Sequence, residues 1–330
     1  MAFEEKVNHS LSPVLEIFKK ACSEIAVLIR NNNSTELGVG NKGSNQSGDT
    51  VKKLDMVCQD IISKKLIECD LVRGYASEEE KEVYWTSHRS APFFVTFDPL
   101  DGSSNIEVNI ATGTIFTIFY FDSKGEIHDG RQIIAAGYSL YSSATELVVA
   151  TKLPRKIRRY LLTDGKGGEG GSVGSGVGDG VSSSVADGVG CSVEWKEIPM
   201  VFFTQPDKYY SINESNRLKW PEWIQRWNLS QLEEGRTARW VGSLVADGHR
   251  TLIRGGIFSY PGDRVNKNGK LRLLYEAYPF AFIFWAAGGL GMDDHNNYLI
   301  EYFVPWDNIH QKVGLFLGDL KSMSHMIKFF

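Results

Sequence analysis

Two aspartates, Asp98 and Asp101, follow the apolar run 93–97 and precede a glycine and two serines, Ser103 and Ser104. Carboxylate oxygens are the ligands that hard cations such as Mg²⁺ take in proteins. The glycine and the serines allow backbone N–H groups at the start of a helix to turn toward one phosphate group. The segment therefore predicts a phosphate site beside bound cations, although the same residue types also cap ordinary turns.

Two other acidic segments favour the functional interpretation. Glu78 and Glu79 lie in the acidic run 77–80, and Glu276 follows a segment that begins with Lys270. Hydrolysis of a phosphate monoester requires cations that neutralise the phosphoryl oxygens, activate a water molecule and stabilise the leaving oxygen. Carboxylates brought to one place supply the ligands for such cations. The three segments together predict the site of a metal-dependent phosphatase.

The sequence predicts helices and strands in alternation around these residues. Ser12 and Pro13 suit the start of a first helix, and a second helix that carries Asp55 is expected from Asp49 to about Cys69. Strand-like runs follow at residues 93–97, 114–121 and 147–151. This order of elements predicts a layered α/β or α+β fold.

Composition excludes several classes of protein. Of the 330 residues, 42% are apolar and 23% are charged, which is ordinary for a globular chain. A net charge of −4 with mixed signs gives no basic surface for nucleic acid. The N-terminal segment lacks the apolar stretch of a signal peptide, and the apolar run 280–290 is too short to span a bilayer. We therefore expect a cytoplasmic protein with neither nucleic acid nor membrane as a partner.

Residues 164–190 differ in character from the rest of the chain. Glycine occupies 11 of these 27 positions, and most of the others are Ser, Val, Asp or Ala. Such a segment has no side chains from which to build a core. We expect a disordered insert that interrupts a hairpin and is dispensable for chemistry.

The run FDPLDGSSNIE resembles the motif of class I fructose-1,6-bisphosphatases, and the resemblance covers nearly the whole chain outside the insert. The further matching blocks, in order, are GDTVKKLD, ASEEEK, GTIF, AAGYSLYSSAT, YSINE, ARWVGSLVADGHRTL, GGIFSYP and GKLRLLYEAYP. The resemblance implies a sugar-phosphatase αβαβα sandwich with two sub-domains. Residues 1–195 would carry the metal-binding motifs, and residues 196–330 would bind the sugar phosphate. The implied reaction is the Mg²⁺-dependent hydrolysis of the 1-phosphate of fructose 1,6-bisphosphate, as in gluconeogenesis.

The resemblance also implies roles for individual residues. The implied ligands of two or three Mg²⁺ ions, with Mn²⁺ as an alternative, are Glu78, Glu79, Asp98, Asp101, Glu276 and the backbone carbonyl of Leu100. Glu78 would be shared between metal and water, and Asp55 would pair with it to orient or deprotonate the attacking water. A carboxylate crowded by others has a raised pKa, which suits that role. Asp49 would anchor a loop for catalysis or would simply cap the second helix.

Two groups of residues would hold the phosphates of the substrate. Ser103 and Ser104 would bind the 1-phosphate. The residues implied for the distal phosphate are Asn213, Arg239, Tyr260 and Lys270, with Arg272 close by. Family members take the arginine from a neighbouring subunit, so a homodimer or homotetramer is expected.

The chain departs from the family pattern near the distal phosphate, where Asn216 and Trp240 replace two tyrosines. The loss of both hydroxyl donors leaves sedoheptulose 1,7-bisphosphate open as the substrate. A sugar-phosphate sensor with little catalytic activity is the alternative from another class. An inositol-type monophosphatase would have no use for Arg239 or Lys270. Tyr120 stands where the family's AMP site has an arginine, so AMP is not expected to inhibit through that site.

Overall fold

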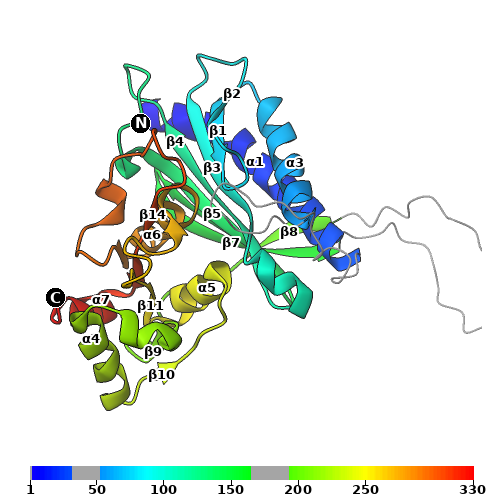
Figure 1. Cartoon of the computed structure of the whole chain (residues 1–330). Coiled ribbons are helices and arrows are strands. Elements are labelled where there is room, and N and C mark those ends of the chain that lie inside the picture. Colours follow the sequence, from blue (N-terminus) through cyan, green and yellow to red (C-terminus); the bar gives the residue numbers. More distant parts are fainter. Residues whose placement is uncertain (1, 32–52, 165–192) are drawn as a thin grey trace, which may run out of the picture.

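The computed structural model of the chain describes residues 2–31, 53–164 and 193–330 (Figure 1). Asp49 and the glycine-rich residues 165–190 lie outside these ranges. What we expect of them stays a prediction.

An eight-stranded sheet forms the centre of the N-terminal part. Its strands lie in the order β2-β1-β3-β4-β5-β6-β7-β8, with β1 and β3 parallel and the other neighbours antiparallel. The bounds are β1 Val72–Ser77, β2 Tyr84–Trp85, β3 Phe93–Asp101, β4 Thr112–Tyr120, β5 Ile133–Tyr141, β6 Thr145–Lys152, β7 Arg155–Asp164 and β8 Val193–Ile198. The three predicted strands are confirmed as β3, β4 and β6. Asp164 pairs with Val193 across β7 and β8, so the glycine-rich segment does interrupt a hairpin.

The prediction that the first helix begins at Ser12 and Pro13 is wrong, because α1 runs Ala2–Asn31 with Pro13 inside it. A proline in a helix interior removes one backbone donor and usually ends the helix. Here Leu11, Val14 and Phe18 follow helical spacing and are all buried against the sheet. The buried face of the helix thus continues from one side of Pro13 to the other, and its packing on the sheet favours a continuous helix.

Helix α3, Lys53–Ile67, corresponds to the second predicted helix and ends two residues before Cys69. Its side chains Leu54, Cys58, Ile62 and Leu66 recur every four residues and are buried. They share a hydrophobic cluster with α1 and with the neighbouring face of the large sheet. Helices α1 and α3 therefore form one layer on that face (Figure 1).

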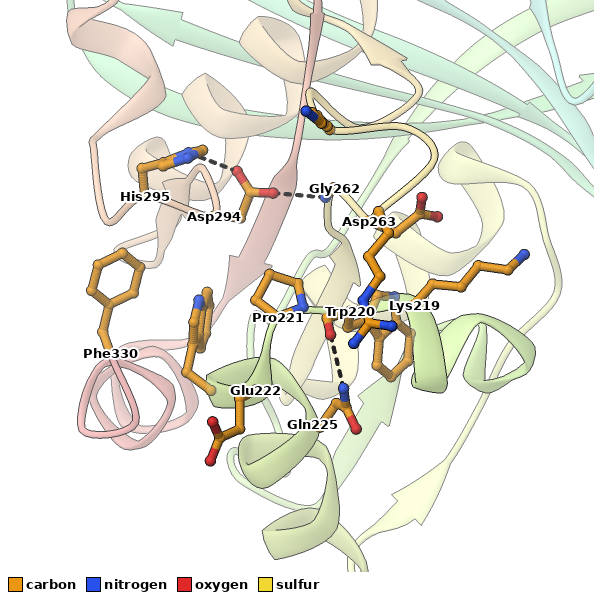
Figure 2. A pocket seen from close by; sticks show the side chains of 13 residues that line it. Lys219, Trp220, Pro221, Glu222, Gln225, Gly262, Asp263, Asp294, His295 and Phe330 are labelled. Carbon is orange, nitrogen blue, oxygen red and sulfur yellow. Dashed lines mark hydrogen bonds and ion pairs between the residues drawn. The ribbon is translucent and has the colours of Figure 1, made fainter.

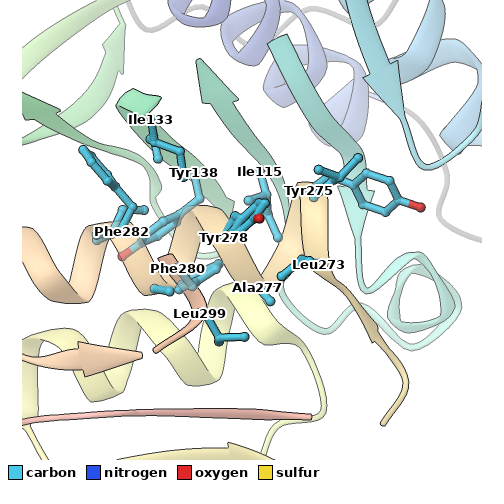
Figure 3. Packing of buried hydrophobic residues seen from close by; sticks show 14 of the residues in the cluster. Ile115, Ile133, Tyr138, Leu273, Tyr275, Ala277, Tyr278, Phe280, Phe282 and Leu299 are labelled. Atoms are coloured by element: carbon cyan, nitrogen blue, oxygen red, sulfur yellow. The ribbon is translucent and has the colours of Figure 1, made fainter. Parts of the chain in front are cut away.

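Helices α5, Leu244–Arg254, and α6, Tyr278–Ala286, cover the opposite face of the large sheet. Figure 3 shows Tyr138 and Ile115 of the sheet against α6, where the rings of Tyr138 and Phe280 stack with centroids 4.9 Å apart. The sequence of α6 is apolar all round, which is typical of a helix buried on every side. Its second neighbour is a smaller sheet.

The smaller sheet has the strand order β10-β9-β11-β15-β13. The bounds are β9 Tyr209–Ser211, β10 Thr237–Ala238, β11 Ile257–Tyr260, β13 Leu290–Met292 and β15 Leu315–Gly318. Its outer face packs on α4, Glu222–Glu233, and α7, Leu320–Ile327, through a cluster that includes Trp227, Phe316 and Met323. Helices, sheet, helices, sheet and helices thus alternate, which confirms the predicted αβαβα layering.

The remaining described elements are short. They are η1 Ser103–Val108, η2 Gly130–Gln132, η3 Glu214–Lys219, the π-helical turn η4 Leu273–Ala277, η5 Leu299–Glu301, and the paired strands β12 Leu271–Arg272 and β14 Lys312–Val313. Strand β8 spans the predicted boundary between residues 195 and 196, and the division into sub-domains stays a prediction. Among the described helices, none has the length and apolar character needed to cross a bilayer.

Candidate active site

Three buried carboxylates meet at the end of β3. Asp98, Asp101 and Glu276 are 1%, 7% and 3% exposed, and one oxygen from each lies within 4.8 Å of the others. We call these three residues the carboxylate cluster. Asp98 and Asp101 come from β3, and Glu276 comes from η4, far along the chain.

A bulge in β3 brings Asp98 and Asp101 to the same side of the sheet. Asp98 pairs with Ile115 and Asp101 pairs with Gly113, so β3 uses one residue more than β4 over this stretch. In a regular strand, residues three apart point to opposite faces, and one inserted residue reverses that relation. The bulge therefore allows both carboxylates to face η4.

The η4 turn is held against β3 by a hydrogen bond from the Thr96 hydroxyl to the Leu274 carbonyl, at 2.8 Å. The Glu276 carboxylate in turn accepts the Arg272 backbone N–H. Single π-helical turns are frequent at functional sites. In this chain the turn directs Glu276 toward the two aspartates of β3.

Burial raises the pKa of each member of the carboxylate cluster. The pKa of Asp98 lies well above its usual range because of burial, and the charge of Glu78 adds to the rise. Burial raises the pKa of Asp101 to about 6, against hydrogen bonds from Val245 and Ser243 that lower it. Burial raises the pKa of Glu276 to about 8, although the Arg272 guanidinium opposes the rise. Three ionised carboxylates are thus unfavourable here without a counter-charge, and a divalent cation fits such a donor set.

The structure places Glu78, more than Glu79, against this cluster. The Glu78 carboxylate forms a hydrogen bond with Asp98, and its Oε1 lies 2.8 Å from Nη2 of Arg272. Glu79 is half-buried and donates its backbone N–H to Ser77 Oγ at 3.3 Å, and it is not a member of the three-carboxylate cluster.

Three other predicted residues lie at positions compatible with the site. Asp55 is buried in the first turn of α3. Burial raises the pKa of the nearby Cys58 thiol, and the negative charges of Asp55 and Asp98 add to the rise. Ser103 and Ser104 begin η1 directly after the Asp101 segment, the first half-buried and the second exposed.

Arg272, which is predicted to lie close to the distal phosphate, forms ion pairs with two carboxylates in the structure. Its guanidinium contacts Glu78 and lies 3.9 Å from Glu276 Oε2, and the residue is buried. It therefore offers positive charge at the carboxylate cluster.

A separate pocket brings together three of the residues predicted for the distal phosphate, Asn213, Tyr260 and Lys270. It is lined by Ile212, Asn213, Asn216, Trp220, Ser259, Tyr260, Pro261, Asp263, Asn266 and Lys270, and we call it the distal pocket. Asn213 Oδ1 accepts the Ser215 backbone N–H at 3.2 Å and the Ser215 hydroxyl at 2.6 Å, which leaves Nδ2 as a donor for a ligand. Burial raises the pKa of Tyr260, so its hydroxyl keeps its proton at neutral pH. A second pocket adjoins this one and shares Trp220 and Asp263 with it (Figure 2).

Arg239 is exposed and does not line the distal pocket of its own chain. Its Nη1 donates to the Ala238 carbonyl at 2.9 Å, and its guanidinium carbon lies 5.9 Å from the centre of the Tyr209 ring. The ring of the next residue, Trp240, lies against the rings of Phe258 and Tyr260, with centroid distances of 6.1 and 5.9 Å.

The start of α5 supports the site in a way that the sequence analysis missed. Asp101 Oδ2 accepts the Val245 backbone N–H at 2.9 Å and the Ser243 hydroxyl at 3.1 Å. The fully buried Asp247 accepts the backbone N–H groups of Val241 and Gly242, at 2.9 to 3.0 Å. No local sequence pattern predicts that Ser243 or Asp247 supports the site, because each does so through hydrogen bonds that form only in the folded protein.

Comparisons with known proteins identify the family. Residues 2–167 match the model described as fructose-1-6-bisphosphatase, N-terminal domain, and residues 203–330 match the corresponding C-terminal domain. The chain belongs to the fructose-1,6-bisphosphatase family. The resemblance stated from the sequence motifs is thereby confirmed. Asp98 and Asp101 fall in the N-terminal match and Glu276 in the C-terminal match, so the carboxylate cluster joins the two matched regions.

Individual relatives span most of this chain. A fructose-1,6-bisphosphatase class 1 of Persephonella marina is 36% identical, and the match covers 99% of this chain and 95% of the relative. One from Sorangium cellulosum is 40% identical over 87% of this chain and 78% of the relative. A chloroplastic fructose-1,6-bisphosphatase of Triticum aestivum is 32% identical over 99% of this chain and 78% of the relative.

A solved structure supports the same family fold. The crystal structure of Leishmania major fructose-1,6-bisphosphatase in holo form superposes with a TM-score of 0.80 at 26% identity. The match covers 97% of this chain and 94% of the Leishmania chain.

Proposed function

We propose that the chain is a phosphoric monoester hydrolase that removes the 1-phosphate of fructose 1,6-bisphosphate and releases fructose 6-phosphate. The observation that carries the proposal is the carboxylate cluster, which holds three buried carboxylates within 4.8 Å in a member of this family. A separate pocket with a lysine, a tyrosine and an asparagine fits the second phosphate of such a substrate. A metal site and a distal anion pocket together suit a bisphosphate better than a monophosphate.

The proposed metal ligands are Glu78, Glu79, Asp98, Asp101, Glu276 and the carbonyl of Leu100, for two or three Mg²⁺ ions, with Mn²⁺ as an alternative. The raised pKa values of Asp101 and Glu276 support this assignment, because such carboxylates gain most from a neighbouring cation. When bound, the cations neutralise the phosphoryl oxygens and lower the pKa of a coordinated water.

Side chains of this protein would then accept the proton of the attacking water and bind the phosphate groups. Asp55 and Glu78 would orient the attacking water and take its proton on a carboxylate oxygen. The Arg272 guanidinium, 2.8 Å from Glu78, would orient that carboxylate. Ser103 and Ser104 would donate to the 1-phosphate, and Asp49 would anchor a loop for catalysis or cap the second helix.

The distal phosphate would be held by Asn213, Tyr260 and Lys270, with Arg239 supplied by a neighbouring subunit. The exposure of Arg239 and its absence from the lining of its own distal pocket support the last point. We therefore propose a homodimer or homotetramer. The cytoplasmic location stays a prediction, because some matching relatives are named chloroplastic.

Phosphate release by the purified chain with Mg²⁺ tests the function. Fructose 1,6-bisphosphate, sedoheptulose 1,7-bisphosphate and inositol 1-phosphate are compared at equal enzyme concentration. The proposal requires the highest kcat/KM on the fructose substrate. A preference for the heptulose would make Asn216 and Trp240 specificity residues, and release from none of the three would favour a sugar-phosphate sensor.

A further inference from the structure

His310 forms a bridge between two segments that bring carboxylates to the site from distant parts of the chain. One ring nitrogen, Nε2, lies 2.9 Å from the backbone carbonyl of Glu80, which ends the acidic run 77–80. The other, Nδ1, forms a hydrogen bond with the hydroxyl of Tyr275 in η4, the residue before Glu276. A half-buried histidine with both nitrogens paired in this way fixes the two segments relative to each other.

The partners of the two nitrogens fit a neutral ring with its proton on Nε2. A backbone carbonyl can only accept a hydrogen bond, so Nε2 of His310 must donate to Glu80. In the neutral ring Nδ1 keeps a lone pair, which accepts the hydroxyl proton of Tyr275. Burial lowers the pKa of His310, which favours this neutral form. An apolar side chain of similar size could make neither bond.

The segment that carries His310 is itself attached to the start of η4. The Leu273 backbone N–H donates to the Gln311 carbonyl at 2.8 Å, and β12 pairs with β14 next to this bond. The imidazole therefore extends from a fixed point beside η4 to the carbonyl of Glu80.

The acidic run is also held by Gln59 of α3. Its Oε1 accepts the Ser77 hydroxyl at 2.6 Å, and its Nε2 donates to Glu80 Oε1 at 3.1 Å. Gln59 and Ser77 are both buried. Gln59 thus joins the acidic run to the helical layer of α1 and α3, whereas His310 joins the same run to the turn that carries Glu276.

We propose that His310 is a positioning residue that sets the separation between the carboxylates of the acidic run and Glu276, and thereby the affinity of the site for a divalent cation. The proposal rests on the proposed function in that these carboxylates bind the metal. His310 would act through Glu80 and Tyr275, without contact with metal or substrate. Loss of the outer hydrogen bonds that orient metal ligands typically costs about ten- to a hundredfold in metal affinity.

Three variants remove the bridge. Tyr275→Phe deletes the hydroxyl that donates to Nδ1. In His310→Gln the amide nitrogen can take the place of Nε2 and keep the bond to Glu80, while the bond to Tyr275 is lost. The combination of the two substitutions removes the same bond once more. All three proteins should therefore show equal effects, as expected for residues that share one interaction.

Tyr138→Phe is the matched control. Tyr138 is a fully buried tyrosine like Tyr275, and its hydroxyl likewise forms a hydrogen bond with Nδ1 of a histidine, His249, at 2.8 Å. The pair lies on β5 and α5, outside the acidic run and η4. The control therefore removes an equivalent hydrogen bond that does not join the two carboxylate-bearing segments.

Two readouts are measured on the full-length protein. The first is the Kd of Mn²⁺ by isothermal calorimetry without substrate, and the second is the Mg²⁺ concentration that gives half-maximal phosphate release from fructose 1,6-bisphosphate. Each bridge variant should raise both about tenfold, with KM for the bisphosphate at saturating Mg²⁺ within about twofold of the unmodified protein. Tyr138→Phe should change neither readout, even where it lowers Tm as much as Tyr275→Phe does.

The outcomes separate this proposal from the function on which it rests. A Kd of Mn²⁺ within about twofold in Tyr275→Phe and His310→Gln would overturn the role of His310, and so would an equal rise in Tyr138→Phe or effects that add in the combined variant. Mn²⁺ binding by an unmodified protein that hydrolyses no bisphosphate would overturn the proposed function, and the Kd values would still decide the role of His310. If the unmodified protein binds no Mn²⁺, both proposals fall.

Discussion

Replacement of Asp101 by asparagine should separate stability from catalysis. Its Oδ2 accepts the Val245 N–H and the Ser243 hydroxyl, and an asparagine oxygen in the same place can accept both. The substitution therefore keeps the local hydrogen bonds and removes one negative charge from the carboxylate cluster. We expect a more stable metal-free protein with greatly reduced turnover.

The size of the stability gain follows from the pKa of Asp101, which burial raises from 3.8 to about 6. A carboxyl whose folded pKa lies above its unfolded value stabilises the fold when protonated, and that contribution is lost as pH rises through the folded pKa. At pH 8 the rise of about 2 units corresponds to about 3 kcal/mol of destabilisation by the ionised group. With an unfolding entropy of about 2.1 cal/mol/K per residue, relief of this cost would raise Tm by roughly 4 °C.

Differential scanning calorimetry in EDTA at pH 8 measures this gain, and phosphate release with Mg²⁺ measures the loss of turnover. Loss of a metal-ligand charge should lower kcat/KM by at least about a hundredfold. A metal-free Tm equal to or below that of the unmodified protein would refute the reasoning about charge repulsion. Turnover within tenfold of the unmodified protein would refute the assignment of Asp101 as a ligand.

Three further predictions address other parts of the chain. Lys270→Ala should raise KM for fructose 1,6-bisphosphate at least about tenfold and leave hydrolysis of fructose 1-phosphate unchanged, since only the bisphosphate uses the distal pocket. Equal effects on both substrates would argue against Lys270 as a ligand of the distal phosphate. In the metal-free protein, calorimetry should show that Tm falls from pH 5 to pH 8. The pKa values of Asp101 and Glu276 are raised to about 6 and about 8, so their ionisation over this range destabilises the fold. Added Mg²⁺ should remove the fall, and a Tm that rises from pH 5 to pH 8 would contradict the prediction. Deletion of residues 165–190 should leave kcat and KM within about twofold, since β7 and β8 already pair from Asp164 to Val193 and a short turn can join them; a large loss of turnover would show that the segment is functional.

Much of the carboxylate cluster was predictable from the sequence, and its geometry was not. The motif around Asp98 and Asp101 marked the metal site, and the matching blocks brought in Glu276. The spacing of three would put the two aspartates on opposite faces of a regular strand. The bulge that reverses this is set by pairing with β4, which no local pattern records.

Contacts between distant segments account for most of what sequence reasoning missed. The ion pair between Arg272 and Glu78 is one such contact: Arg272 ends β12 directly before η4, and the fold places this point beside the carboxylate cluster. The start of α1 was misplaced because proline is a strong local signal for a helix start. The buried stripe on both sides of Pro13 depends on the sheet that α1 covers.

The central claim is that Asp98, Asp101 and Glu276 form the metal centre of a fructose-1,6-bisphosphatase. Its most direct test is phosphate release from fructose 1,6-bisphosphate, titrated with Mg²⁺, by the unmodified protein and by Asp98→Asn, with folding checked by circular dichroism. The account predicts release that requires Mg²⁺ and falls at least about a hundredfold in the folded variant. Equal release by the two proteins, or release by the unmodified protein that persists in excess EDTA, would contradict it.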